Sequence, residues 1–268
     1  MKAKILSGKP IRDQVLNDLM GMVKKLKRKP TLAIVLVGDD PASAVYVREK
    51  EKAAASIGID FQLIKKPSNV KQNELEEIII NLNQDKKVRG IVVQKPLPHQ
   101  IDGERIDRLV APEKDVDGLN PASHFHPTTA QGVIKLLKEN KIEIAGETAV
   151  VVGRSKLSGL PTALLLLDED ATVTICHSKT RNLKEETQQA DILVSATGVP
   201  GLIKADMVKK GAVVIDVGTT RVKEGKIIGD VDFENVKKVA GYISPVPGGV
   251  GPMIVAGLMI NLVEAASR

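Results

Sequence analysis

The sequence predicts an α/β protein of two domains, each a mostly parallel sheet with flanking helices. Short apolar runs of strand length alternate with segments of helical periodicity along the chain. This alternation occurs in two successive series, and 268 residues suffice for two ordinary domains. The second domain is expected to be Rossmann-like, because its series opens with a strand, a glycine turn and a helix start.

The first series reads as helix, strand, helix, strand, helix, strand. Residues 11–27 place apolar side chains at helical spacing, and residues 31–38 form a continuous apolar run typical of a parallel strand covered on both faces. Asp40 and Pro41 begin a helix that Gly58 ends. The remaining predicted elements are a strand at 61–65, a helix opened by a capping box of Asn73 and Glu76, and a strand at 90–94.

The second series repeats this order. Its expected elements are helices at 131–140 and 159–167, strands at 148–152, 171–175, 191–196 and 212–217, a hairpin turn at 224–226, and a final apolar helix at 253–266. Residues 244–252 contain three prolines and three glycines, which excludes regular structure there. We expect domains at 1–120 and 121–250, with the helix at 251–268 packing back on the first.

Composition restricts the class of protein. The net charge of +6 fits an enzyme for anionic substrates, a nucleic-acid binder or a solvated lysine-rich surface. With no Trp, two Tyr and three Phe, the chain has few side chains on which bases could stack, so nucleic acid is not expected as a partner. A single cysteine, no unbroken apolar run of about 18 residues and no apolar core near the start predict a cytoplasmic protein without a membrane segment.

The segment at 149–159 predicts a phosphate site. A buried strand leads into a turn at Gly153, Arg154 and Ser155, and a helix starts near Gly159. Such a turn directs backbone N–H groups and the positive end of a helix at a phosphate. The pattern is not GxGxxG, and an ordinary turn between strand and helix remains an alternative.

The end of the following strand indicates which dinucleotide binds. An NAD site needs a carboxylate there for the ribose 2′-hydroxyl, but this strand runs into His177, Ser178 and Thr180, with Lys179 and Arg181 among them. Cations and hydroxyls suit a 2′-phosphate, and Arg154 could reach it from the preceding turn. A basic surface loop is the alternative. The prediction is NADP rather than NAD.

Candidate catalytic residues lie in the first half. Tyr46 and Lys50 are four residues apart and share a helix face, although a packed Tyr beside a solvated Lys is commonly structural. Gln94 ends a parallel strand, where open α/β sheets bind ligands. Asp117 lies in a loop with Asp115. The Tyr–Lys pair precedes the nucleotide turn by about a hundred residues, an order that argues against short-chain dehydrogenases.

Together these segments resemble the bifunctional methylenetetrahydrofolate dehydrogenase/cyclohydrolases. The similar segments run in the family's order and cover nearly the whole chain: YVREKEKAAASIGI (46–59), VVQKPLPHQI (92–101), PEKDVDGLN (112–120), VVVGRSKLSGLP (150–161), CHSKT (176–180), DILVSATG (191–198), VIDVG (214–218), GDVDF (229–233) and SPVPGGVGPMIVAGLM (244–259).

The resemblance implies the roles of named residues. Lys50 would be the central catalytic residue with Gln94, Tyr46 and Asp117 beside it, Tyr46 stacking on the aminobenzoate and Asp117 binding the pterin amino groups. NADP would contact Gly153, Arg154, Ser155, His177, Ser178, Thr180, Thr197, Gly198, Gly218 and Thr219. Pro245, Gly248 and Gly249 would line the folate site. No metal is expected, since His124 and His126 alone are insufficient.

The implied activity is NADP-dependent oxidation of 5,10-methylenetetrahydrofolate and hydrolysis of the methenyl product to 10-formyltetrahydrofolate, in one-carbon metabolism. The alternatives are a dehydrogenase without hydrolysis and a non-catalytic NADP-binding protein. The resemblance also implies a homodimer formed through the nucleotide domain.

The sequence departs from the family pattern at several positions. Lys95 stands where the family commonly has Leu, Ser158 where it has Val, and Thr128-Thr129-Ala130 where it has Cys-Thr-Pro.

Overall fold

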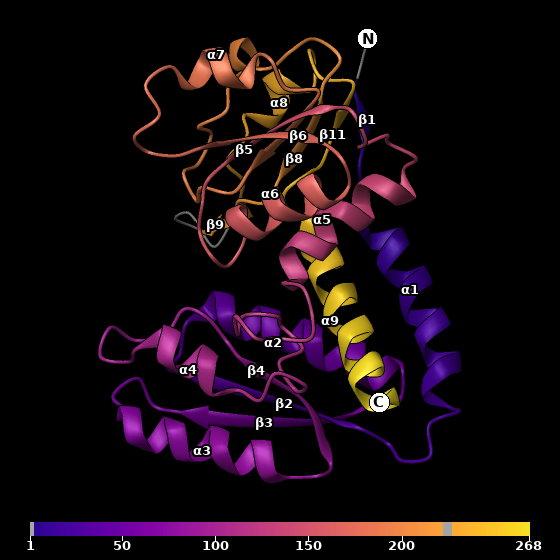
Figure 1. Ribbon diagram of the computed structural model, residues 1–268, viewed down its shortest axis with the longest axis vertical. Helices are drawn as coiled ribbons and strands as arrows, with labels where there is room; N and C mark the ends of the chain where they lie inside the picture. Colours follow the sequence, from indigo (N-terminus) through magenta and orange to yellow (C-terminus); the bar gives the residue numbers. More distant parts are fainter. Residues whose placement is uncertain (1–2, 222–226) are drawn as a thin grey trace. The chain divides into compact units, whose positions relative to one another are not determined.

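The computed structural model describes residues 3–221 and 227–268 (Figure 1). The chain forms two compact units: unit 1 contains Met1–Arg12 and Thr129–Ile254, and unit 2 contains Asp13–Thr128 and Val255–Arg268. The hairpin turn predicted at 224–226 lies outside the described residues.

Unit 2 contains a parallel sheet in the order β3-β2-β4. Its strands are β2 (Thr31–Val37), β3 (Asp60–Lys66) and β4 (Val88–Val93). Strand β3 pairs with one side of β2, and β4 pairs with the other side. The two successive connections of the chain therefore lead to opposite sides of β2. This reversal makes the carboxyl ends of β2 and β4 a topological switch point, where ligands of open α/β sheets bind.

Alternating side chains of β2 enter two separate cores, which explains its unbroken apolar run. Leu32, Ile34 and Leu36 face one core, and Ala33, Val35 and Val37 face the other. The first core receives α1 (Gly8–Val23), α2 (Pro41–Ser56) and α9 (Val250–Ser267). The second receives α3 (Gln72–Gln84) and α4 (Gly103–Leu109).

Helix α9 is a core helix. By length and mean hydropathy (1.6) it could cross a membrane, although its apolar run is interrupted by polar residues. In the structure, 61% of these 18 residues are buried. Leu258, Met259 and Leu262 belong to the first core of unit 2. A buried apolar helix of a soluble protein passes the same test of length and composition, and burial favours that interpretation here.

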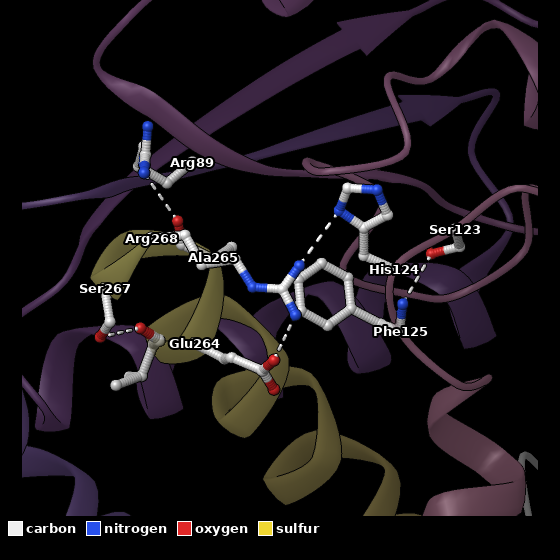
Figure 2. A network of polar contacts seen from close by, with 9 residues as sticks. Arg89, Ser123, His124, Phe125, Glu264, Ala265, Ser267 and Arg268 are labelled. Atoms are coloured by element: carbon white, nitrogen blue, oxygen red, sulfur yellow. Dashed lines mark hydrogen bonds and ion pairs between the residues drawn. The ribbon is translucent and has the colours of Figure 1, made fainter.

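Polar contacts hold the C-terminal end of α9 (Figure 2). The Arg268 guanidinium donates to Glu264 (2.6 Å), lies 3.1 Å from His124 Nδ1 and stacks over the Phe125 ring, 5.2 Å from its centroid. Arg89 donates to the Ala265 carbonyl (2.8 Å). The Arg268 contacts join this end of the chain to the segment after Asn120, and the Arg89 bond joins the last turn of the helix to β4, all within unit 2.

Unit 1 contains a parallel sheet of six strands in the order β1-β11-β8-β7-β5-β6. The strands are β5 (Thr148–Val152), β6 (Thr172–Cys176), β7 (Ile192–Ser195), β8 (Val213–Asp216), β11 (Tyr242–Ile243) and β1 (Lys4–Ile5). Strand order reverses beside β5, which makes the carboxyl ends of β5 and β7 a second switch point. This is a Rossmann-like arrangement.

Helices cover both faces of this sheet. Side chains of α5 (Thr128–Glu139) and α6 (Gly159–Asp168) enter one core. Side chains of α7 (Leu183–Thr187), the 3-10 helix η1 (Ala205–Met207) and α8 (Phe233–Val236) enter the other. A two-stranded antiparallel ribbon of β9 (Thr220–Arg221) and β10 (Ile227–Ile228) completes the unit. The fold class predicted from the sequence is confirmed.

Three local expectations differ from the structure. The sequence excludes regular structure over residues 244–252, but α9 begins at Val250 and holds Pro252 in its first turn. The sequence places the first residues in the same domain as residues 13–120, but β1 pairs with β11 of unit 1, and the compact units divide after Thr128 rather than near Asn120. Asn73 is not a cap, because α3 already begins at Gln72. A strand of two residues has no periodicity to read, so only its distant partner defines it.

Two buried ionisable residues shape the loop that carries Asp117. Lys114 donates to the carbonyls of Leu82 (3.2 Å), Asn83 (2.6 Å) and Asp85 (2.8 Å), satisfying the C-terminal end of α3. Asp115 is 3% exposed and accepts from the backbone N–H of Asn120 (2.7 Å). Burial raises the pKa of Asp115 to about 6, and the nearby Asp117 and Asp107 carboxylates add to the effect.

The substitution Asp115→Asn tests this account. A carboxyl whose pKa rises from about 3.9 in the unfolded chain to about 6 on folding binds more protons in the folded state between those values. Its contribution to stability therefore falls as pH rises from about 4 to about 6. Asn keeps an acceptor but does not ionise, so the free energy of unfolding of the variant relative to the parent should rise over this range, by about 2 kcal/mol. Urea unfolding at pH 4, 5, 6 and 7 measures it.

Asp206→Asn is the matched control. Asp206 is exposed, and its hydrogen bond with Lys184 lowers its pKa. Folding lowers the pKa of this carboxyl instead of raising it, so the difference between that variant and the parent should stay nearly constant, with no rise, from pH 4 to 6. The same constant difference for Asp115→Asn would contradict the account.

Candidate active site

Helix α2 carries the candidate catalytic lysine into the interior of unit 2. The Asp40 side chain caps the helix by accepting from the Ser43 N–H (2.7 Å), and Pro41 occupies its first position, as predicted. Lys50, on the third turn, is only 5% exposed. Burying an ammonium group is costly unless it has hydrogen-bond partners, so the position requires a polar neighbour.

Gln94 supplies that neighbour. It follows β4 at the switch point of the sheet, is 9% exposed, and its Oε1 accepts from Lys50 Nζ (3.1 Å). Its Nε2 donates to the Lys95 carbonyl (2.8 Å), which fixes the orientation of the amide. The structure therefore brings Lys50 and Gln94 together, with the amide oxygen directed at the ammonium group.

Tyr46 lies one helical turn before Lys50. The structural alternative of a packed Tyr beside a solvated Lys does not describe this pair: Tyr46 is half-buried and Lys50 is buried. Lys50 is thus the more buried of the two residues, and Tyr46 is partly exposed.

The charge added by Lys95 is neutralised locally. Its Nζ lies 2.7 Å from Asp107 Oδ1, and its carbonyl accepts from Gln94 and from the Ser43 hydroxyl (3.3 Å). Burial raises the pKa of Asp107, although the hydrogen bond and charge of Lys95 act in the opposite direction. The backbone that orients Gln94 is therefore independent of the side chain that departs from the family pattern.

Asp117 contacts Thr128, another position that departs from the family pattern. The Thr128 hydroxyl donates to Asp117 Oδ1 (2.7 Å), and the Thr128 N–H donates to the Asp117 carbonyl (3.2 Å). Thr128 is 3% exposed, whereas Asp117 is half-buried. The bond fixes one carboxylate oxygen of Asp117.

The turn after β5 requires glycine at two positions. Gly153 has φ +113°, and a Cβ there would overlap the Ala196 carbonyl oxygen at the end of β7. A Cβ at Gly159 would overlap the Gly153 carbonyl oxygen. Arg154 and Ser155 are exposed in this turn, and the Ser155 and Ser158 hydroxyls share a hydrogen bond (2.8 Å). The turn thus closes tightly on the switch point of unit 1.

The end of β6 lies next to this turn, because the Gly153 N–H donates to the Cys176 carbonyl (2.8 Å). Thr180 Oγ1 accepts from the His177 N–H (2.9 Å), and His177 Nδ1 accepts from the Lys179 N–H (3.1 Å), so these side chains shape the loop. Ser178 stays exposed. No carboxylate occurs among residues 177–181.

The other predicted cofactor and substrate residues follow later strands of unit 1. Thr197 and Gly198 follow β7, and Gly218 and Thr219 follow β8. The Thr220 hydroxyl donates to the Gly198 carbonyl (3.1 Å), which joins the two loops. The glycine-rich loop with Pro245, Gly248 and Gly249 follows β11, with φ +112° at Gly248.

Sequence reasoning missed the residues that support the predicted ones. Lys114, Asp115 and Thr128 surround Asp117, and Asp216 and Asp230 underlie the loops after β7 and β8. The signal of all of these except Thr128 is present in the segments PEKDVDGLN, VIDVG and GDVDF as acidic and basic residues beside apolar residues. Among the described residues, no group of three His, Cys, Asp or Glu could hold a metal ion.

Both parts of the chain match known protein families. Residues 6–117 match the catalytic domain of tetrahydrofolate dehydrogenase/cyclohydrolase, and residues 127–268 match its NAD(P)-binding domain. The bifunctional protein FolD of Moorella thermoacetica is 50% identical, with 100% of each chain covered.

Solved structures agree. The FolD dehydrogenase/cyclohydrolase of Campylobacter jejuni has a TM-score of 0.95 at 43% identity, with 99% of each chain covered. The Trypanosoma brucei FolD, complexed with NADP cofactor and inhibitor, has a TM-score of 0.96 at 38% identity, covering 100% of this chain and 98% of its own. This chain therefore belongs to the tetrahydrofolate dehydrogenase/cyclohydrolase family.

Proposed function

We propose that the protein oxidises 5,10-methylenetetrahydrofolate with NADP and hydrolyses the 5,10-methenyl product to 10-formyltetrahydrofolate. The observation that carries the proposal is the buried Lys50, held by the Gln94 amide at the switch point of unit 2. Burying an ammonium group lowers the stability of the fold, and residues buried at such a cost are typical of functional sites.

The dinucleotide fits the residues of unit 1. Gly153 forms a turn that a Cβ would fill, Arg154 and Ser178 are exposed on neighbouring loops, and residues 177–181 offer cations and hydroxyls without a carboxylate. We assign the 2′-phosphate to Arg154 and Ser178, and the remaining contacts to Ser155, His177, Thr180, Thr197, Gly198, Gly218 and Thr219. NADP, when bound, accepts the hydride.

The oxidation needs no proton from the protein. A hydride leaves the one-carbon bridge of the folate, so the task of the chain is to hold its substrate in a reactive geometry. We assign the aminobenzoate ring to the accessible face of Tyr46 and the pterin amino groups to Asp117. Pro245, Gly248 and Gly249 remain predicted substrate contacts of unit 1.

The hydrolysis does need proton transfer. Water adds to the methenyl carbon and loses a proton, and the bond from this carbon to the pterin nitrogen then breaks as that nitrogen gains one. The oxygen loses its remaining proton to solvent as the formyl C=O forms. We assign both transfers to Lys50, which takes the proton from water and returns it to the departing nitrogen. Gln94 orients Lys50 Nζ without adding a charge beside the cationic substrate.

Each alternative function would leave one observed arrangement without a role. A dehydrogenase without hydrolysis would not need Lys50 and Gln94 in contact, and a non-catalytic NADP-binding protein would not need the Asp117 loop. Both arrangements are present. Absorbance distinguishes the three possibilities, because NADPH forms in the first step and the methenyl chromophore disappears in the second.

We further propose a cytoplasmic homodimer assembled through unit 1. Strand β6 is an edge of the sheet, and its Ile175 is exposed together with Leu164 and Leu167 of the neighbouring helix α6. An unpaired edge strand beside large exposed apolar side chains favours association with a second copy.

Lys50→Ala tests the central assignment. The variant should lose at least about 100-fold in methenyl hydrolysis, because general acid–base catalysis contributes on this scale. NADP binding should be retained, since its proposed contacts lie in unit 1. Stopped-flow loss of methenyl absorbance and fluorescence titration with NADPH measure the two properties. Hydrolysis at the parent rate would remove Lys50 from the mechanism.

Thr128→Val tests the support of Asp117. Valine keeps the shape of the side chain but cannot donate, so the KM for the folate should rise about tenfold, as expected for one lost hydrogen bond to a charged group. The KM for NADP should not change. Thr128→Ser, which keeps the hydroxyl, is the matched control and should restore the parent value. Equal folate KM values for Val and Ser would show that the bond has no effect on binding.

Leu167→Glu tests the proposed interface. A charge on the apolar surface of α6 should shift the protein from dimer to monomer in sedimentation velocity, because the charge would be buried on association. Ile80→Glu, at another exposed apolar position on α3 in unit 2, should leave the dimer intact. A parent protein that sediments as a monomer, or a Leu167 variant that remains dimeric, would contradict this interface.

A further inference from the structure

Two carboxylates lie fully inside unit 1 below the loops proposed to hold the dinucleotide. Asp216 ends β8 and is 3% exposed, and Asp230 follows β10 and is 0% exposed. Neither belongs to the predicted site, and no lysine or arginine forms an ion pair with either among the described residues. Burial of two acids without a cation is costly and requires a specific reason.

Asp230 gathers the loop after β7. Its Oδ2 accepts from the backbone N–H of Thr197 (2.6 Å) and of Gly198 (3.3 Å), from the Thr197 hydroxyl (2.9 Å) and from the Ser195 hydroxyl (3.0 Å). Four donors on one oxygen define the path of this loop. Thr197 and Gly198 are proposed cofactor contacts, so the carboxylate determines where they lie.

Asp216 gathers the loop after β8 and holds Asp230 in turn. Its Oδ1 accepts from the N–H of Gly218 (2.9 Å) and of Asp230 (3.0 Å), and its Oδ2 from the N–H of Val231 (3.0 Å). Its own N–H donates to the Ser244 hydroxyl (2.8 Å), at the start of the glycine-rich loop. The two carboxylates thus hold the loops after β7 and β8, and the backbone of Asp216 contacts the start of a third loop.

Two glycines permit the close packing of the pair. A Cβ at Gly218 would overlap Asp230 Oδ1, and a Cβ at Gly229 would overlap Asp216 Oδ2. The Asp230 carboxylate therefore packs against Gly218, and the Asp216 carboxylate packs against Gly229. Asp230 Oδ1 has no hydrogen-bond partner among the described residues, and burial raises the pKa of Asp216 to about 6, with the charge of Asp230 contributing.

We propose that Asp230, held by Asp216, is a positioning residue for dinucleotide binding: it sets the geometry of the Thr197–Gly198 loop without touching the ligand. The inference rests on the proposed function. If the arrangement served only stability, uncharged side chains would serve it better, because an unpaired buried oxygen lowers stability. The positioning role explains the burial, because Asp230 orients four hydrogen-bond donors at the edge of the sheet.

Asp230→Asn and Ser195→Ala test the proposal. Asn keeps the shape but replaces one oxygen with a donor group, and we expect the KM for NADP to rise at least about tenfold with a smaller change in kcat. Ser195 is 0% exposed and therefore cannot contact a ligand, so any effect of its substitution passes through Asp230. We expect a rise of about threefold to tenfold for that variant.

Three measurements separate positioning from loss of fold. Methenyl hydrolysis without nucleotide depends on Lys50 and should stay within twofold of the parent in both variants. NADPH fluorescence titration should show weaker binding that parallels the KM. Asp206→Asn, an exposed carboxylate of the same unit paired with Lys184, is the matched control and should retain the parent KM.

The outcomes distinguish this inference from the proposed function. A parent enzyme that reduces no NADP would overturn the proposed function itself. An active parent whose Asp230 and Ser195 variants keep the parent KM for NADP would overturn the positioning role alone. Equal losses of hydrolysis and of NADP reduction would show that the pair serves only stability.

Discussion

The reversal of strand order beside a central parallel strand is the constraint on which both proposed sites depend. In unit 2 the reversal separates the connections that leave β2 and β4, and Lys50 and Gln94 meet there. In unit 1 it separates those that leave β5 and β7, where Gly153 packs against Ala196. Because connections diverge only at such a point, backbone groups there remain available for a ligand.

The sequence predicts the strands and helices around these points well, since buried parallel strands are continuous apolar runs and α2 carries a standard cap and proline. It fails where a long-range partner defines the element. Strand β1 has two exposed residues, and only its pairing with β11 places it in the sheet of unit 1. No periodic signal exists in two residues.

The candidate site follows the same division. Lys50, Gln94 and Asp117 were predicted from their motifs, but the resemblance could not say which of them is buried or what orients each. Asp216 and Asp230 are 14 residues apart in sequence, and their shared hydrogen bonds depend on two strands and the segment after β10. A hydrogen-bond partner at that separation is a property of the fold and not of a motif.

The departures from the family pattern show how a site tolerates substitution. At Lys95 the structure uses the backbone carbonyl to orient Gln94 and pairs the side chain with Asp107, so the new charge does not reach the amide. At Thr128 the hydroxyl itself contacts Asp117. A substitution whose side chain is neutralised by a neighbour leaves the chemistry unchanged, whereas one that donates to a functional carboxylate becomes part of the site. Under the proposed assignment of Asp117 to the pterin, Thr128 is therefore the departure through which this chain can differ from its relatives in folate binding.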